Sequence, residues 1–242
     1  MPKKGLKWGL GQSPENITYY ERNHTMKPLN KYIDHTNLKP FATAADIEKL
    51  CAEAREFDFA SVCVNPCNVA LAKKLLEGSD VKVCTVIGFP LGQNTTAVKV
   101  AETVDAYANG CEEFDMVINV GKLKEGEEDY VRAEIAAVVA AAGGKTVKVI
   151  IETGLLTDGE KATATRLTCE AGADYVKTCT GFSAGAAAVE DVRLMKANLS
   201  GKTQIKASAG IKTYEQTKAL IEAGAERIGT SAGTAIVREA TK

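Results

Sequence analysis

The stretch that decides the fold of this chain is Ala173-Asp174-Tyr175-Val176-Lys177-Thr178-Cys179-Thr180-Gly181-Phe182-Ser183. In it, a short apolar run ends in a lysine and passes into a loop of hydroxylated residues and glycine. The segment Gln204-Ile205-Lys206-Ala207-Ser208-Ala209-Gly210 repeats the same arrangement. Barrels and open sheets built from parallel strands carry their functional groups at the carboxyl ends of the strands. Two successive lysines of this kind therefore indicate a site.

Outward from this stretch, short apolar runs alternate with helical patterns along the chain. Strands are expected at 32–34, 60–64, 81–87, 113–119, 147–152, 175–177, 204–207 and 227–229. Helices are expected near 67–77, 95–109, 127–142, 158–171, 185–199 and 213–223, with another helix starting at Thr43–Asp46 and a short one at the end. Eight strand–helix units, with strands that are apolar rather than alternating, predict a single (β/α)8 TIM barrel over residues 29–242. A doubly wound open sheet is the alternative, although the chain lacks the glycine-rich nucleotide-binding motifs.

Composition narrows the class of protein. The 242 residues include 30 basic and 31 acidic side chains, and this balance argues against a nucleic-acid or membrane surface. We find no apolar run that suits a membrane span or a signal peptide. Seven cysteines scattered through apolar segments favour reduced thiols and a cytoplasmic location. Residues 1–28 are polar and aperiodic, which predicts a short N-terminal extension.

Polar residues at the predicted strand ends form the candidate site. They are Asp34, Cys63, Asn65, Asp115, Asn119, Glu152, Lys177 and Lys206. Asp115, Lys177 and Lys206 sit within runs that should otherwise be buried. A purely structural explanation remains open, because a lysine can extend its stem to reach solvent and an aspartate can pair with an arginine. Two lysines on adjacent strands, together with carboxylates on other strand ends, favour chemistry instead.

Two neighbouring lysines solve a chemical problem. A free lysine has a pKa of about 10.4 and is almost entirely charged at neutral pH. Burial and a nearby ammonium both lower the pKa of a lysine, which leaves a neutral, nucleophilic amine. Such an amine forms a Schiff base with a carbonyl, and the protonated imine accepts electrons when an adjacent carbon–carbon bond breaks. The Asp115 carboxylate would then transfer protons.

The loops after the last three strands suit a phosphate group. They read Thr180-Gly181-Phe182-Ser183, Ser208-Ala209-Gly210-Ile211-Lys212 and Gly229-Thr230-Ser231-Ala232-Gly233. Barrels of this kind often bind phosphate after strands seven and eight, through backbone N–H groups at a helix start. With Lys212 as counter-charge, the loops predict a phosphorylated substrate. Cys63 and Cys67 lack a second pair of ligands at zinc spacing, so no metal site is expected.

Taken in order, several motifs resemble one enzyme family. They are Tyr32-Ile33-Asp34-His35-Thr36, Ser61-Val62-Cys63-Val64-Asn65-Pro66, Val86-Ile87-Gly88-Phe89-Pro90-Leu91-Gly92, Glu113-Phe114-Asp115-Met116-Val117-Ile118-Asn119, Tyr175-Val176-Lys177-Thr178-Cys179-Thr180-Gly181-Phe182, Ile205-Lys206-Ala207-Ser208 and Arg227-Ile228-Gly229-Thr230-Ser231. From about residue 29 to 238 the chain resembles the deoxyribose-phosphate aldolases. The resemblance implies a class I aldolase that interconverts 2-deoxy-D-ribose 5-phosphate with acetaldehyde and D-glyceraldehyde 3-phosphate, in deoxyribonucleotide catabolism. It implies no cofactor and no metal, and a homodimer or homotetramer.

The resemblance also assigns roles to residues. Lys177 would form the imine, Lys206 would lower the pKa of Lys177 and donate or accept protons, Asp115 would transfer protons, and Asp34 would lie near Lys206. The substrate-binding residues that it implies are Cys63, Thr180, Gly181, Ser208, Gly210, Lys212, Gly229, Thr230 and Ser231. The chain departs from the family pattern at Cys179, where serine is frequent, and at Ala209, where the family often has a second glycine.

Two other classes of function stay open at this point. One is another phosphate-binding barrel, such as an isomerase or a zinc-dependent aldolase. Those enzymes need a Glu/His pair or a histidine cluster, and the chain has only His24 and His35. The other is a non-catalytic barrel that binds a sugar phosphate, or a protein partner through its N-terminal extension.

Overall fold

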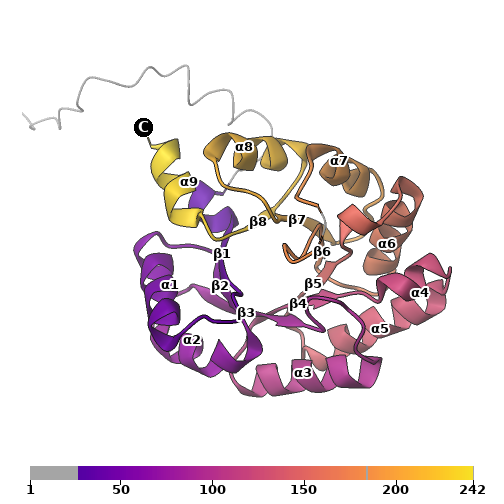
Figure 1. Cartoon of the computed structure of the whole chain (residues 1–242), viewed down its shortest axis with the longest axis horizontal. Helices are drawn as coiled ribbons and strands as arrows, with labels where there is room; N and C mark the ends of the chain where they lie inside the picture. Colours follow the sequence, from indigo (N-terminus) through magenta and orange to yellow (C-terminus); the bar gives the residue numbers. More distant parts are fainter. Residues whose placement is uncertain (1–26, 184, 242) are drawn as a thin grey trace, which may run out of the picture.

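A computed structural model describes residues 27–183 and 185–241, and most of the predicted extension at 1–28 lies outside these ranges. Eight parallel strands run in chain order around a closed barrel, and β1 pairs with β8 to complete it. The helices surround the barrel as an outer ring (Figure 1). The predicted (β/α)8 TIM barrel is therefore confirmed, and the alternative of an open sheet is wrong.

The elements follow one another as strand and helix. The strands are β1 (Ile33–Asn37), β2 (Ser61–Val64), β3 (Lys82–Ile87), β4 (Glu113–Val117), β5 (Thr146–Ile150), β6 (Tyr175–Lys177), β7 (Gln204–Ser208) and β8 (Arg227–Thr230). The α-helices are α1 (Ala44–Glu56), α2 (Val69–Leu75), α3 (Thr96–Ala108), α4 (Val120–Lys124), α5 (Glu128–Ala141), α6 (Asp158–Glu170), α7 (Val189–Ala197), α8 (Tyr214–Ala223) and α9 (Gly233–Ala240).

Local capping explains several element boundaries. The predicted helix start at Thr43–Asp46 is a capping box, in which each side chain accepts a hydrogen bond from the other residue's backbone N–H. The strand predicted to reach Asn119 instead ends at Val117, because the Asn119 side chain accepts the Lys122 N–H at 3.0 Å and starts α4. That short helix, separate from α5, was not predicted.

The two faces of the strands differ in chemistry. Apolar residues such as Phe114, Val149 and Ile205 belong to the main hydrophobic cluster together with residues of the surrounding helices. Their neighbours in sequence, such as Asp115 and Lys206, point the other way and contact one another inside the barrel. The expectation of strands that are apolar rather than alternating is therefore wrong for β4 and β7, because the barrel interior holds charged side chains.

Closure of the barrel places distant segments side by side. Asp34 on β1 lies in register with Gly229 on β8, and Lys206 on β7 lies in register with Arg227. This brings Asp34 next to side chains almost 200 residues further along the chain.

Among the residues that the structure describes, no helix is long and apolar enough to cross a membrane.

Candidate active site

Asp115 is the centre of the charged interior. Its Oδ2 atom lies 2.6 Å from the Nζ atom of Lys177 and 2.6 Å from that of Lys206. Its Oδ1 atom accepts hydrogen bonds from Lys148 Nζ at 2.9 Å and from the Cys84 thiol at 3.2 Å. The structure thus brings the predicted residues Asp115, Lys177 and Lys206 together at one carboxylate.

Lys206 connects Asp115 to a second buried carboxylate, that of Asp34. The Nζ atom of Lys206 is 2.6 Å from Asp34 Oδ2, as predicted, and both side chains are fully buried. Burial alone would lower the pKa of Lys206, but the carboxylates of Asp115 and Asp34 outweigh burial and raise that pKa above its ordinary value. Lys206 therefore stays an ammonium. Burial opposes ionisation of Asp115, yet Lys148, Lys177 and Lys206 hold its pKa well below the usual range.

The sequence reasoning missed Lys148, Glu113 and Arg227. Lys148 lies 2.6 Å from Glu113 and also binds Asp115. Arg227 contacts Glu113 at 2.7 Å and donates from Nε to Asp34 at 2.8 Å. A signal for them existed, because each is a charged residue in a predicted strand, as Asp115 is. The predicted alternative of an aspartate paired with a structural arginine thus applies to Asp34.

The charges of this cluster balance without Lys177. Three carboxylates (Asp34, Glu113 and Asp115) face three fixed cations (Lys148, Lys206 and Arg227). Lys177 is a further basic group at the edge of this cluster, where it donates to Asp115 and also lines the cavity above.

A cavity of about 320 Å³ opens above the cluster. Lys177 lines it, together with eight of the nine predicted substrate-binding residues. These are Thr180, Gly181, Ser208, Gly210, Lys212, Gly229, Thr230 and Ser231. The remaining walls come from the end of β1 and the residues after it, which include Thr36 and Leu38, and from Phe182, Ala209 and Ile211. Besides Lys177, the lysines Lys39 and Lys212 line the cavity, and together with several backbone amides they make it a suitable place for an anion.

The ninth predicted residue, Cys63, lies outside that lining. It is buried on β2 beside Cys84 of β3 and Asp115, and the three offer potential ligand atoms within 4.8 Å of one another. The Lys148 ammonium already contacts two of these atoms, Cys84 Sγ at 3.3 Å and Asp115 Oδ1.

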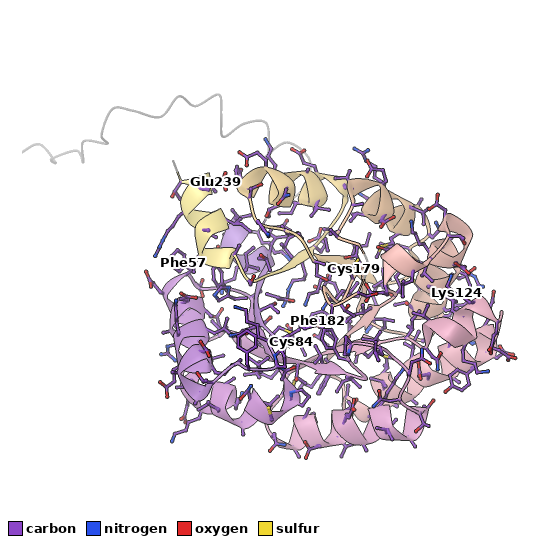
Figure 2. All side chains as sticks on the ribbon, in the orientation of Figure 1. Phe57, Cys84, Lys124, Cys179, Phe182 and Glu239 are labelled. Atoms are coloured by element: carbon purple, nitrogen blue, oxygen red, sulfur yellow. The ribbon has the colours of Figure 1, made fainter. Side chains whose placement is uncertain are left out.

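In Figure 2, Cys84 and Phe182 lie near the middle of the barrel, whereas Lys124 and Glu239 lie on the outer helices.

Half of the eight predicted strand-end residues lie within their strands instead. Asp34, Cys63, Asp115 and Lys206 sit within their strands and face the barrel interior, so that Lys177 is the charged group at the last position of a strand. The other three predicted residues follow their strands: Asn65 precedes a 3-10 turn, Asn119 caps α4, and Glu152 begins a second 3-10 turn. Depth in the barrel therefore separates the charged cluster from the cavity above it.

The loop after β7 has an unusual backbone. Ala209 has φ +85°, a left-handed conformation that costs a residue with a side chain about 1–2 kcal/mol relative to glycine. Gly210 is also left-handed, and a Cβ there would come within 2.7 Å of Ala186. Glycine is thus required at 210, whereas alanine at 209 is tolerated with strain. The Ala209 carbonyl accepts the Ala187 N–H at 3.0 Å, which holds the loop against its neighbour.

The fold and the site together define a class of protein. A lysine at the floor of a cavity lined by glycines, hydroxyls and further lysines, next to a carboxylate and a fixed ammonium, is typical of a carbon–carbon lyase that works through an imine.

Comparisons with known proteins agree with this class. The profile of the DeoC/LacD family aldolases matches residues 29–240. The chain is 61% identical over 212 residues to a deoxyribose-phosphate aldolase of Streptococcus suis, with 88% of this chain and 96% of the relative covered. It is 60% identical over 209 residues to that of Brevibacillus brevis, covering 86% and 95%. A tetrameric deoxyribose phosphate aldolase structure from Aeropyrum pernix superposes with a TM-score of 0.81 at 31% identity, covering 88% and 91%. The chain belongs to the DeoC/LacD family of aldolases.

Proposed function

We propose that this protein is a deoxyribose-phosphate aldolase, which reversibly cleaves 2-deoxy-D-ribose 5-phosphate into acetaldehyde and D-glyceraldehyde 3-phosphate in deoxyribonucleotide catabolism. The observation that carries the mechanism is the Asp115 carboxylate shared between Lys177 and Lys206, at 2.6 Å from each. The relatives that bear this name match nearly their whole length. The neutral cluster and the cavity above it supply what the reaction needs.

Lys177 forms the covalent intermediate. Its neutral amine adds to the C1 aldehyde of the open-chain sugar, and loss of water from the carbinolamine gives a protonated imine. When the C3 hydroxyl loses its proton, the C2–C3 bond breaks and its electron pair moves into the imine. Glyceraldehyde 3-phosphate leaves, and an enamine remains on Lys177. Protonation of C2 and addition of water then release acetaldehyde and restore the amine.

Asp115 and Lys206 have different roles in proton transfer and charge stabilisation. The Asp115 carboxylate lies next to the reacting nitrogen, so it can accept and return the protons of carbinolamine and enamine steps. Lys206 is held as an ammonium by Asp115 and Asp34, which suits it to disfavour a second positive charge on Lys177 and to donate a proton. A raised pKa makes Lys206 a poor proton acceptor at neutral pH, so we assign acceptance to Asp115.

The phosphate group binds in the cavity above the charged cluster. Gly181 and Gly210 lie in the loops after β6 and β7, Gly229 lies near the end of β8, and all three line the same cavity as Lys212 and Ser231. Backbone N–H groups near helix starts, together with Lys212, suit a dianionic group. Phosphate binding there places the aldehyde end of the sugar toward Lys177, because that residue lines the same cavity. Cys63, below the cavity, takes part through the buried cluster rather than as a wall.

Trapping of the imine tests this proposal. Incubation with acetaldehyde and sodium borohydride is expected to reduce the imine to a stable amine, inactivate the enzyme and add one ethyl group to Lys177. Mass spectrometry of a proteolytic digest locates the label. Saturating substrate should protect against trapping by acetaldehyde, and EDTA should leave the cleavage rate unchanged. Label on another lysine, or no label with full activity, would refute the imine mechanism at Lys177.

The rival barrel chemistries lack their residues in this cavity. His35 is the one histidine among the residues that the structure describes, and its Nε2 lies 2.8 Å from Glu53 of α1. Its ring packs against Phe59 at 5.1 Å between centroids. A Glu/His pair on that side of β1 faces the helices and does not reach the cavity. Assignment of the protein as an isomerase or as a zinc-dependent aldolase therefore has less support than the imine mechanism.

An outer face supports the predicted homodimer or homotetramer. On the neighbouring helices α3 and α5, the exposed positions include Val98, Val104, Tyr107, Ala133 and Ala136, with few charges between them, whereas the exposed side of α1 is mostly charged. We assign this face to contact with a second copy of the chain.

Sedimentation equilibrium tests this assignment. The parent protein should form at least a dimer, and the Val104→Glu variant should be a monomer. A monomeric parent protein contradicts the assignment.

The seven free thiols support the predicted cytoplasmic location.

A further inference from the structure

Glu152 is a buried carboxylate that the mechanism above does not use. It follows β5 and is 2% exposed. Its backbone has φ +57° and ψ +65°, the left-handed conformation that residues with a side chain rarely adopt. Among the described residues only Asp58, Glu152 and Ala209 combine a side chain with positive φ, and two of these belong to loops at the carboxyl end of the barrel. Strain of this kind persists where surrounding contacts require it, often at functional sites.

The side-chain hydrogen bonds of Glu152 come from one residue, Thr180. Both carboxylate oxygens accept the backbone N–H of Thr180 at 3.3 Å, and Oε2 accepts the Thr180 hydroxyl at 2.5 Å. The same hydroxyl oxygen accepts the Phe182 N–H at 3.1 Å. Next to these bonds, the Thr153 N–H donates to the Thr178 carbonyl at 3.0 Å. The loop after β5 therefore holds the turn at 180–182 through the Glu152 side chain.

This turn forms part of the cavity wall. Thr180, Gly181 and Phe182 line the cavity together with Lys177. Gly181 has φ +82°, and a Cβ on it would lie 3.6 Å from the Cβ of Ala209 in the loop after β7. The turn thus abuts the segment that carries Gly210 and Lys212, where the phosphate is proposed to bind. A small rotation of the turn would change the anion-binding wall and leave the buried lysines in place.

We propose that Glu152 is a positioning residue that holds the 180–182 turn in the shape that receives the phosphate end of the substrate. The inference rests on the proposed function, which places the phosphate in this cavity. A carboxylate suits the task because it accepts several hydrogen bonds and donates none. An amide in its place keeps one acceptor oxygen but presents an NH2 donor instead of the other, so the three bonds to Thr180 cannot all survive.

Three variants test this role. Glu152→Gln replaces one of the two acceptor oxygens with an NH2 donor, and Thr180→Val removes the hydroxyl that links Glu152 to Phe182. Thr203→Val is the matched control, since its hydroxyl is also buried and donates to the Ala173 carbonyl at 2.8 Å before β7, at the opposite end of the barrel. The readouts are KM and kcat for deoxyribose 5-phosphate, the inhibition constant of inorganic phosphate, and the rate at which acetaldehyde with borohydride labels the protein.

Glu152→Gln and Thr180→Val are each expected to raise KM and the phosphate inhibition constant about tenfold or more, because displaced binding groups lose much of their interaction. The double variant should show little more than the larger single effect, since both changes act on one turn. Labelling by acetaldehyde, which has no phosphate, should keep its parental rate in every variant, and Thr203→Val should match the parent throughout.

Two results would overturn the inference. If KM and the phosphate inhibition constant stay at parental values while only the melting temperature falls, Glu152 supports the fold alone. If acetaldehyde labelling slows in parallel with phosphate binding, Glu152 acts on the lysine site rather than on the phosphate wall. Failure of the proposed function gives a different result, because the parent protein itself would then remain unlabelled. If Glu152→Gln does not fold, Glu152→Asp, which keeps the carboxylate on a shorter side chain, decides between these outcomes.

Discussion

Lys177→Met is expected to lose cleavage activity by at least about ten-thousandfold, because no other amine occupies the position from which an imine can form. Methionine keeps most of the side-chain volume, so the packing around the end of β6 is retained. The loss of the amine leaves Asp115 with Lys148 and Lys206 as partners. The six remaining charges of the cluster balance, so the variant should fold and melt near the temperature of the parent.

The measurement combines a coupled assay for released glyceraldehyde 3-phosphate with borohydride trapping. Lys202→Met serves as the control, since Lys202 is an exposed lysine that pairs with Asp174 at 2.7 Å at the start of β7. The control should keep parental activity and its label on Lys177. Turnover within tenfold of the parent in Lys177→Met, by a protein with a parental melting curve, would show that the imine forms elsewhere.

Asp115→Asn is expected to harm both stability and turnover. Asp115 accepts hydrogen bonds from three lysines and one thiol, all of them buried. Removing the charge leaves buried ammonium groups without their shared partner, a change that costs about 3–5 kcal/mol in comparable buried pairs. The proton-transfer group is lost as well, which should lower kcat by about a hundredfold or more in the molecules that remain folded.

The pH dependence of stability separates this charge effect from a change in packing. The folded-state pKa of Asp115 is held well below that of an unfolded aspartate, which titrates near about 3.9. The carboxylate therefore contributes its full stability above that value, and the contribution is lost as the pH falls through the folded-state pKa. The free energy of unfolding of parent and variant should differ by a constant amount above about pH 5 and converge in more acidic solution.

Urea unfolding at several pH values measures this difference. Asp129→Asn is the control, because Asp129 is a highly exposed carboxylate that pairs with Arg132 on the surface of α5. Surface pairs of this kind contribute little, so its unfolding curve should follow that of the parent. A stability difference for Asp115→Asn that does not change between pH 7 and pH 3 would assign the loss to packing instead of charge.

Much of the fold was predictable because each strand–helix unit carries its own local signals. The apolar face of β6 and the lysine at its end are contiguous in the sequence, and capping residues such as Thr43 define helix starts by local hydrogen bonds. The cavity lining was also predictable, since its glycines and hydroxyls lie at the ends of β6, β7 and β8 or directly after them. Local composition is sufficient for such features.

The depth of the charged residues was not predictable in the same way. Asp115 and Lys206 were expected at strand ends but lie within β4 and β7, and the strands alternate between a charged interior and an apolar exterior. A period of two within a strand of five residues is a weak signal, and only packing of one face against helices decides which side is inside. For the same reason, the position of Lys148 inside the barrel was not predicted.

By itself, the sequence determined the barrel, the catalytic lysine candidates and the loops proposed to bind phosphate, because periodicity and loop chemistry act over short segments. The tertiary structure decided which charges meet. Closure through β1 and β8 places Asp34 against Lys206 and Arg227, and the loop after β5 brings Glu152 to Thr180. Such pairings depend on the stagger of neighbouring strands around a closed sheet, a quantity that no single strand encodes.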